Sequence, residues 1–427
     1  MRTLSIVALA MLLVAGTVFA GGSSEPTDPD AIGGTITMLT NRTDVVDTDF
    51  VEYAERFREQ YPDVTVEFEA MTDYEGELRT RMNTQDYGDV LMISSDLPVD
   101  QLPDFHEPLG TYEELKDEYL IVNEQMYDGL VYGIPIGIAV QGIVFNQPVF
   151  DAAGITDLPT TPNGFVEIME QIKANTDAIP YYTNYAAGWP LNWNGHVIGI
   201  SGDPDYPNKV MAEIDEPWAE GEPHYVLAKL LWDLVSADVI EDDPTTTDWE
   251  DSKRIMGNNE IGAMILGSWA ISQMQEFADS PDDIGYMPFP YTVDGQIYSE
   301  MAGDYNIGIN VHSDNKATAR AWVDFFVNES GFAQDQGMIP PVQGASFPET
   351  LVQFENLGVE FLQANPAPEG MEGLVNRIDG RAEIGLNDGA FRQRIVEAAL
   401  GRRDESFQDI MDDLNARWTQ ARDELGL

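Results

Sequence analysis

Short apolar segments alternate with stretches of helical spacing near the start of the chain, and this order constrains the fold most. Residues 35–39 and 89–93 read as buried strands, and residues 64–68 alternate as a third strand. Between them, residues 50–61 place aromatic side chains on one helical face, and residues 73–84 also have a helical pattern. Strands joined through helices lie parallel, with right-handed crossovers and helices on both faces of the sheet. We therefore predict an α/β domain on a mainly parallel sheet.

The same alternation returns further along the chain. Trp322, Phe325 and Phe326 have helical spacing and are expected in a core. With 427 residues the chain is long enough for two such domains. We expect two α/β lobes, with the chain crossing between them more than once. The later strands are predicted at 142–145, 261–266 and 306–311, and the later helices at 162–174, 390–400 and 405–423.

Acidic residues dominate the charge of the chain. Asp and Glu number 75 against 22 Lys and Arg, a formal charge of −53. This balance argues against binding to nucleic acid or to an anionic membrane, which both need a basic surface. The acids run along the whole chain and only six of the basic residues are Lys, which favours adaptation to concentrated salt. At about 1 M salt the screening length is roughly 3 Å, so self-repulsion is small. The alternative is an acidic site for a cation such as a polyamine or a metal.

The first residues have the pattern of an export signal. Arg2 precedes an apolar run over 4–15, and small residues at Val18 and Ala20 suit a signal peptidase. We expect a signal peptide at 1–20, cleaved near Ala20, and a flexible leader at 21–34 rich in Gly, Ser, Pro and Asp.

Several kinds of chemistry lack their motifs. The chain has no Cys, which excludes disulfides, thiolate zinc sites and iron–sulfur clusters. No phosphate loop, nucleophile elbow or His-Glu-x-x-His occurs. We predict no catalytic residue, no cofactor and no metal site, although a carboxylate pair for glycoside hydrolysis stays open among 75 acids. The four scattered histidines, which we expect at the surface, are His106, His196, His224 and His312.

Two loops follow predicted strands of the first sheet. Ligands of open α/β sheets bind beyond the carboxyl ends of the strands. The loops at 40–43 and 94–98 should therefore contact a ligand.

Six segments together resemble a known family. In the third, Tyr132-Gly-Ile-Pro precedes a strand ending in Phe145-Asn-Gln, and in the fourth Gly-Ser-Trp269 follows a buried strand. In this order the segments resemble the extracellular solute-binding proteins of sugar ABC importers, the group that includes the maltodextrin-binding protein. The resemblance covers nearly all of 31–420. The segments are the opening strand, helix and strand at 36–68, GDVLMISSD at 88–96, the crossover at 129–155, EIGAMILGSWAISQM at 260–274, the return at 303–345 and the tail at 400–418.

The resemblance implies the two-lobe fold of type II periplasmic binding proteins. Lobe 1 would comprise 35–140 and 303–345, and lobe 2 would comprise 141–302 and 346–427. It implies a hinge near 139–143 and 298–303, with a third crossing near 343–348.

The family's function gives further expectations. Hinge closure would capture a carbohydrate, and the expected ligand is an oligosaccharide. The protein would deliver it to the permease subunits of an ABC transporter without changing it chemically. Many relatives begin with a lipid-modified cysteine, and this chain has none. We therefore expect a soluble periplasmic monomer.

The candidate ligand contacts suit a sugar, whose apolar ring face stacks on aromatic side chains and whose hydroxyls bond carboxylates, amides and guanidinium groups. Bland alternatives exist for several of them: lobe packing for Trp189 and Trp269, a helix cap for Asp96, a solvated side chain for Arg42 and a salt bridge for Arg392. By resemblance the contacts are Asn41, Arg42, Ser95, Asp96, Asn184, Tyr185, Trp189, Trp269, Asp304, Tyr305 and Arg392.

Three other functions are compatible with the sequence. Polyamine binders and ferric-ion binders share the architecture, and adjacent Tyr181 and Tyr182 resemble the paired tyrosines of the latter. A secreted glycoside hydrolase is the enzymatic alternative.

Overall fold

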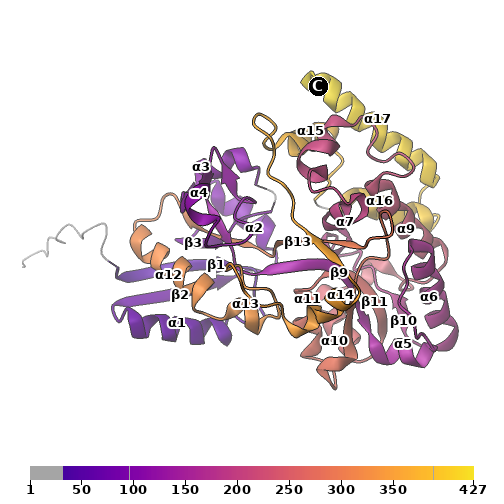
Figure 1. Ribbon diagram of the computed structural model, residues 1–427, viewed down its shortest axis with the longest axis horizontal. Helices are drawn as coiled ribbons and strands as arrows, with labels where there is room; N and C mark the ends of the chain where they lie inside the picture. The colour runs from indigo at the N-terminus through magenta and orange to yellow at the C-terminus, as the bar shows by residue number, and fades with distance from the viewer. Residues whose placement is uncertain (1–31, 96, 388) are drawn as a thin grey trace, which may run out of the picture.

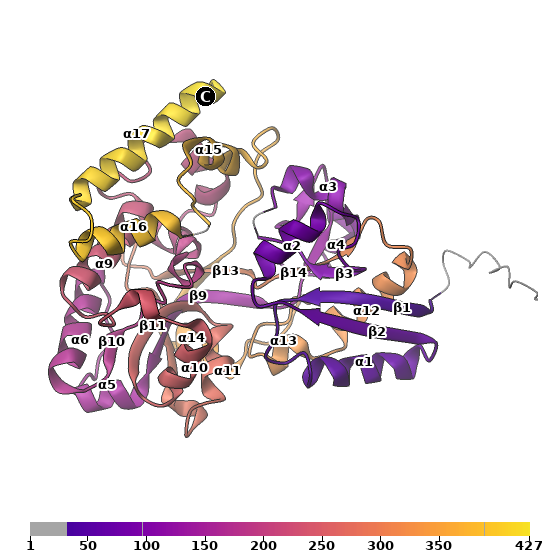
Figure 2. The same cartoon turned by 180° about the vertical axis from the view of Figure 1, so that it is seen from behind.

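The structure is a computed structural model that describes residues 32–95, 97–387 and 389–427. The expected signal peptide, most of the leader and Asp96 lie outside these residues. Two six-stranded sheets, each with helices packed against it, form two lobes placed side by side (Figures 1 and 2). This confirms the predicted two-lobe α/β fold. We call the lobe with the N-terminal strand lobe 1 and the other lobe 2.

Lobe 1 begins with the predicted strand–helix–strand unit. The apolar spacing of 50–61 becomes a helix that buries Phe50, Tyr53 and Phe57 against the sheet. The sheet order is β2 (Val64–Ala70), β1 (Gly34–Thr40), β3 (Val90–Met92), β14 (Asn306–Asn310) and β4 (His106–Glu107), and β8 (Gly133–Pro135) also pairs with β14. The helices of this lobe are α1 (Asp49–Gln60), α2 (Tyr74–Met82), α3 (Leu102–Phe105), α4 (Tyr112–Leu115), α12 (Lys316–Asn328) and α13 (Phe332–Asp335).

The leader ends earlier than expected. Gly33 donates its N–H to Thr318 Oγ1 at 2.9 Å, and Gly34 already belongs to β1. These two residues are therefore tied to lobe 1.

Lobe 2 has its own sheet and a larger helical layer. Its sheet order is β10 (Ile179–Tyr181), β11 (Ile261–Gly267), β9 (Ile138–Asn146), β13 (Tyr298–Gly303) and β15 (Glu360–Leu362), and β12 (Ile284–Met287) pairs with β9. Its helices are α5 (Gln147–Ala153), α6 (Pro162–Asn175), α7 (Val197–Ser201), α8 (Met211–Glu213), α9 (Pro223–Ser236), α10 (Trp249–Gly257), α11 (Ala270–Gln275), α14 (Val352–Asn356), α15 (Leu374–Ala382), α16 (Ala390–Ala399) and α17 (Phe407–Leu425). A small third sheet joins β5 (Gly110–Thr111), β7 (Leu130–Val131) and β6 (Met126–Tyr127).

The expectation of mainly parallel sheets is wrong. β1 is parallel to β2 and β3, but β14 is antiparallel to each of its neighbours β3, β4 and β8. In lobe 2, β9 is antiparallel to β11, β12 and β13. Both strands adjoin the passage between the lobes, so the chain enters each sheet from the other lobe and runs against its neighbours (Figure 2).

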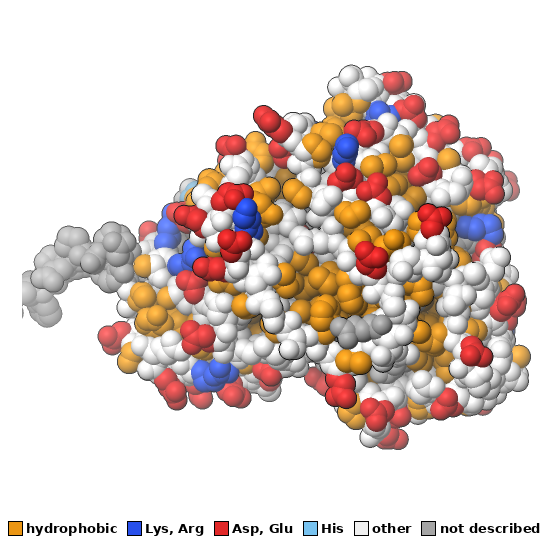
Figure 3. All heavy atoms as spheres, viewed as in Figure 1, with side chains coloured by type: hydrophobic (Ala, Val, Ile, Leu, Met, Phe, Trp, Pro, Cys, Tyr) orange, Lys and Arg blue, Asp and Glu red, His pale blue; other side chains and the backbone are white. Residues whose placement is uncertain are grey.

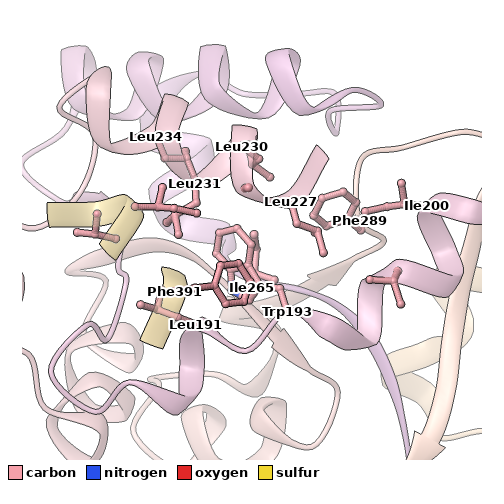
Figure 4. Packing of buried hydrophobic residues seen from close by; sticks show 14 of the residues in the cluster. Leu191, Trp193, Ile200, Leu227, Leu230, Leu231, Leu234, Ile265, Phe289 and Phe391 are labelled. Atoms are coloured by element: carbon pink, nitrogen blue, oxygen red, sulfur yellow. The ribbon is translucent and has the colours of Figure 1, made fainter. Parts of the chain in front are cut away.

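Each lobe has its own hydrophobic core. In lobe 1, Trp322, Phe325 and Phe326 are at most 3% exposed, as predicted from their spacing. In lobe 2, leucines of α9 pack against Ile265 of β11, Trp193 and Phe391 of α16 (Figure 4). Within the described part of the chain, no helix has the length and apolar character needed to cross a bilayer.

Candidate functional site

Loops at the ends of strands in the two sheets bring polar and aromatic side chains near each other. In lobe 1 the chain leaves β1 at Asn41, leaves β3 before Ser95 and enters β14 after Tyr305. In lobe 2 it leaves β10 before Asn184 and β11 before Trp269. The predicted ligand loops at 40–43 and 94–98 are thus at strand ends, with Asp96 outside the described residues.

Arg42 is buried and held in one orientation. Its Nε donates to Asp44 Oδ1 at 2.8 Å and its Nη2 to Asp44 Oδ2 at 2.7 Å. Nη2 also donates to Gln336 Oε1, and the guanidinium lies 5.4 Å from the Phe332 ring centroid. Burial alone would raise the pKa of Asp44, but the hydrogen bond and charge of Arg42 hold that pKa below its ordinary value. Arg42 is therefore a fixed donor and not the freely solvated side chain of the alternative.

Asp304 has a different environment. Its backbone N–H donates to Gly137 O at 2.9 Å, but within the described residues no group donates a hydrogen bond to its carboxylate. Burial raises the pKa of Asp304 to about 6, although the positive charge of Arg42 opposes this shift. At neutral pH the carboxylate is thus mostly ionised and has acceptor capacity left for a ligand.

Glu75 links two predicted contacts. Its Oε1 accepts from Tyr305 Oη at 3.1 Å and from Ser95 Oγ at 3.2 Å, and Ser94 Oγ donates to the other carboxylate oxygen. The Tyr305 ring meets the buried Tyr74 ring edge to face, with centroids 6.0 Å apart. We call Arg42, Asp44, Glu75, Asp304 and Tyr305 the polar group of lobe 1.

Asn41 lies beside this group and has spare hydrogen-bonding capacity. Its Oδ1 is buried, and none of the described residues donates a hydrogen bond to it. An unpaired buried amide oxygen is costly, so an external donor at this position would be favourable.

Three indoles from lobe 2 form a second group, which we call the tryptophan cluster: Trp189, Trp249 and Trp269. The ring centroids of Trp189 and Trp249 are 4.8 Å apart, those of Trp249 and Trp269 are 5.7 Å apart, and those of Trp189 and Trp269 are 5.8 Å apart. Trp189 is 43% exposed, while the other two are half-buried.

Trp269 also packs against other residues. It contacts the core of lobe 1 as well as a core of lobe 2. Its indole lies over Gly267, where an added Cβ would stand only 2.5 Å from Nε1. The lobe-packing alternative for Trp269 therefore describes part of its role, and Trp189 is the most exposed ring of the cluster.

Charges link the tryptophan cluster to the polar group. Lys253 Nζ lies 5.2 Å from the Trp249 ring centroid and pairs with Glu250 at 2.8 Å. The positive charge of Lys253 contributes to lowering the pKa of Asp44 in the other lobe. Burial, reinforced by the charge of Asp44, raises the pKa of Glu276, which follows α11. Charged residues beside the tryptophan cluster therefore lie close enough to interact electrostatically with Asp44 of the polar group.

Asn184 and Tyr185 are held mainly within lobe 2. Asn184 is 1% exposed with φ of 54°, and its Nδ2 faces Ser252 Oγ at 3.5 Å and Met264 Sδ at 3.3 Å. Its Oδ1 is buried and accepts no hydrogen bond from the described residues. Tyr185 Oη donates to Glu397 Oε1 at 2.8 Å, which turns the phenol toward α16.

Arg392 lies in the interior of lobe 2. It is 1% exposed, donates from Nη2 to Asn194 Oδ1 at 2.7 Å and lies 4.4 Å from the Phe391 ring centroid. Burial lowers the pKa of Arg392 to about 9. No carboxylate of the described residues pairs with it, so the salt-bridge alternative does not describe its position.

The histidines differ from the expectation. His106, His196 and His224 are at most 4% exposed, and only His312 is at the surface. Burial lowers the pKa of each buried histidine to about 3. The scattered spacing of the histidines excludes a metal motif but does not predict whether each side chain is buried. A neutral imidazole can pack against aromatic rings in a core, as the His224 ring does beside Trp218.

The two tyrosines that suggested ferric-ion binding do not converge. Tyr181 is buried in the same core as Trp193, whereas Tyr182 belongs to a different core with Met264. Tyr181 is the last residue of β10 and Tyr182 directly follows it, so their side chains diverge into different cores as alternate positions of an extended chain do.

Sequence reasoning missed four members of these surroundings: Asp44, Glu75, Trp249 and Lys253. One signal was available. Asp44 stands two residues after Arg42, close enough for a bidentate pair. Trp249 opens a helix directly after Asp248, whose side chain caps that helix. Trp249 is on the same helical face as the buried Met256 and packs at the edge of a lobe 2 core, so its spacing alone predicts a core residue.

Known proteins resemble this chain in sequence and in structure. A family model described as bacterial extracellular solute-binding protein matches residues 44–331. A binding protein of an ABC transporter from Bifidobacterium animalis subsp. lactis, solved with mannobiose, is 36% identical, with a TM-score of 0.88 over 93% of this chain and 96% of that one. A manno-oligosaccharide specific solute binding protein from the same organism, solved with mannotriose, is 33% identical with the same TM-score and coverage. The multiple sugar-binding protein of Streptococcus mutans is 24% identical over 75% of this chain and 77% of its own length.

Proposed function

We propose, since the chain belongs to the family of bacterial extracellular solute-binding proteins, that it captures an oligosaccharide between its two lobes. The observation that carries the proposal is the pairing of two complementary groups. The polar group of lobe 1 supplies a fixed guanidinium and carboxylates that bond hydroxyls, and the tryptophan cluster of lobe 2 supplies indoles that cover sugar ring faces. The family expected from the sequence is confirmed.

Manno-oligosaccharides are the ligand class we propose first. Two relatives solved with mannobiose and mannotriose are 36% and 33% identical over 93% of this chain. Candidate contacts in this chain are Asn41, Arg42, Ser95, Trp189, Trp269, Asp304 and Tyr305, which lie at strand ends or in the two groups. Asp96 stays a candidate from the sequence. The other three predicted contacts form hydrogen bonds within lobe 2, so they would affect ligand binding indirectly, by positioning nearby loops and α16. They are Asn184, Tyr185 and Arg392.

Closure of a hinge would enclose the ligand and present the closed form to the permease of an ABC transporter. The proposed boundaries are 33–140 with 303–345 for lobe 1, two residues longer than expected from the sequence, and 141–302 with 346–427 for lobe 2. The hinge would then lie in β9 and β13, which pair with each other through Met301 and Val140. A ligand shifts such an equilibrium only by its differential affinity for the two forms.

The polyamine alternative has weaker support in the site. A polyamine needs carboxylates without cationic partners, but Arg42 pairs with Asp44 and also lies close enough to affect Asp304. A ferric-ion site on Tyr181 and Tyr182 has none, because the two side chains lie in separate cores. A glycoside hydrolase would release shorter sugars from an oligosaccharide, whereas a protein that only captures the ligand would leave it intact.

The surroundings in which the protein works are also part of the proposal. We propose export through residues 1–20 to the periplasm and function as a monomer, both of which are expectations from the sequence. Acidic side chains are spread over both lobes on the face in Figure 3, with few basic ones, which supports a surface suited to concentrated salt.

Thermal unfolding against a ligand panel tests the function. The panel holds mannose, mannobiose, mannotriose, spermidine and ferric citrate, in buffer with about 1 M salt. A ligand at about a thousand times its dissociation constant adds roughly 4 kcal/mol to the free energy of unfolding. We expect an upward shift with mannobiose and mannotriose. A shift only with spermidine or ferric citrate, or turnover of an oligosaccharide, contradicts the proposal.

A further inference from the structure

Trp249 was not among the predicted contacts, yet it touches both other indoles of the tryptophan cluster. We propose that Trp249 is a positioning residue that fixes the angle between Trp189 and Trp269, and that this angle favours oligosaccharides over monosaccharides. The inference rests on the proposed function and adds a determinant of ligand length to it.

Trp189 needs support from outside its own segment. It opens a single 3-10 turn, η2 (Trp189–Leu191), and follows Gly188, whose φ is 76°. Its side chain is 43% exposed, so the core does not fix its rotamer. The centroid of the Trp249 ring lies 4.8 Å from that of Trp189 with the planes at 71°, an edge-to-face contact. Trp249 is therefore a direct restraint on the Trp189 ring.

Trp249 is itself anchored on a rigid element. It is the first residue of α10, whose N-cap Asp248 accepts from the Asp251 N–H at 2.8 Å, and Ser252 Oγ donates to Trp249 O at 2.7 Å. Lys253, one turn along the helix, places its ammonium 5.2 Å from the ring centroid. Only 7% of the Lys253 side chain is exposed, and Glu250 holds its ammonium at 2.8 Å. The Trp249 ring is thus held in place by residues of its own helix, α10.

The angle between the two other indoles bears on ligand length. The planes of Trp189 and Trp269 are inclined by 45°, with centroids 5.8 Å apart. A flat face of one sugar ring can lie parallel to only one of two planes at that angle. Stacking on both indoles therefore requires two rings of one ligand, so a monosaccharide gains from one indole only. Loss of the restraint on Trp189 should weaken the stacking of a second sugar ring on Trp189 and leave the stacking of the first ring on Trp269 unchanged.

The test compares Trp249→Ala with Trp249→Phe, which keeps an aromatic edge. Trp232→Ala is the control, because Trp232 is half-buried on α9 and packs against Phe407 instead of the cluster. Titrations give the affinity for mannotriose directly and for mannose by competition. We expect Trp249→Ala to weaken mannotriose binding about two- to tenfold, the scale of one aromatic pair, with mannose unchanged. Trp249→Phe should stay near wild type, and Trp232→Ala should have no effect.

Circular dichroism supplies a measurement that does not depend on a ligand. Neighbouring indoles couple their electronic transitions, so the Trp189–Trp269 pair contributes a couplet to the spectrum. In each Trp249 variant, this couplet is the change in the spectrum when Trp189 is replaced as well. We expect this contribution to persist in Trp249→Phe and to vanish in Trp249→Ala. Equal losses for mannose and mannotriose, or wild-type affinity in Trp249→Ala, overturn the inference. If the wild type binds no saccharide, the proposed function fails, and a couplet retained in Trp249→Ala then overturns the positioning role separately.

Discussion

The two lobes present different chemistry at their junction. Lobe 1 offers charged and hydroxyl side chains that already bond one another, such as Arg42 with Asp44 and Tyr305 with Glu75. Lobe 2 offers three indoles whose mutual contacts are edge-to-face or tilted. Hydrogen bonds depend on where each sugar hydroxyl lies, whereas stacking depends on the orientation of the whole ring face. Lobe 1 should therefore decide which hydroxyl pattern binds, and lobe 2 should decide how many rings bind.

The largest effect should follow a change in lobe 1. Asp304→Asn removes an ionised acceptor, and a hydrogen bond to a charged group is worth about 1.5–3 kcal/mol. Because sugar hydroxyls favour the ionised form, wild-type affinity should be highest above the pKa of Asp304, about 6, and fall as the pH decreases through it. Titration calorimetry from pH 7.5 to 5 measures this.

The variant should lose most of that pH dependence. Exposed Asp314→Asn is the matched control and should keep both the affinity and the pH profile of the wild type. An unchanged profile in Asp304→Asn would remove Asp304 from the site.

A change in lobe 2 should have the next largest effect. Trp269→Ala should weaken oligosaccharide binding by at least about 1–2 kcal/mol, the scale of a lost aromatic stack. The loss should be similar for epimers of the sugar, because stacking does not read hydroxyl positions. Trp232→Ala again serves as control. Unchanged affinity would mean that Trp269 only packs the lobes together.

Acid stability separates a ligand effect from unfolding. His106 lies on β4, away from both groups, and burial lowers its pKa to about 3. The unfolded chain protonates His106 near pH 6.5, whereas the folded chain keeps it neutral at that pH. The free energy of unfolding therefore decreases as the pH falls below about 6.5. His106→Phe should reduce the fall in unfolding free energy between pH 7.5 and 5.5 by about 1 kcal/mol. Chemical denaturation at the two pH values measures it, and an undiminished fall would contradict the assignment.

The smallest effect should come from a contact between the lobes. Arg377 on α15 lies 3.6 Å from Asp100 of η1 (Val99–Gln101) in lobe 1, and both side chains are more than a third exposed. Exposed pairs contribute about 0.2–1 kcal/mol and are screened by salt. Asp100→Asn should therefore speed ligand dissociation at most about fivefold at low salt and not at about 1 M salt. Stopped-flow fluorescence measures the rate, and an effect that persists at high salt would point to another role.

Local pattern predicted the elements but not every direction of the chain. The spacing of Phe50, Tyr53 and Phe57 gave α1 within one residue of its observed ends, because burial of one helical face depends on nearby residues. The antiparallel course of β9 and β14 depends on where the chain crosses between lobes, which no local pattern contains.

The candidate site was predictable to a similar degree. The strand-end argument predicted the loop that contains Arg42, because topology fixes where strands end, whereas Asp304 was expected from the family resemblance. Partners distant in sequence, such as Glu75 with Tyr305, depend on tertiary packing. Arg392 was expected to face a ligand or to form a salt bridge, and only the folded interior shows that its partner is Asn194.

Titration calorimetry of the wild-type protein with mannotriose, in buffer with about 1 M salt, tests the central claim most directly. We predict saturable binding of one mannotriose per chain, with weaker binding of mannose. No binding of any manno-oligosaccharide, together with saturable binding of spermidine or ferric citrate, would contradict the account.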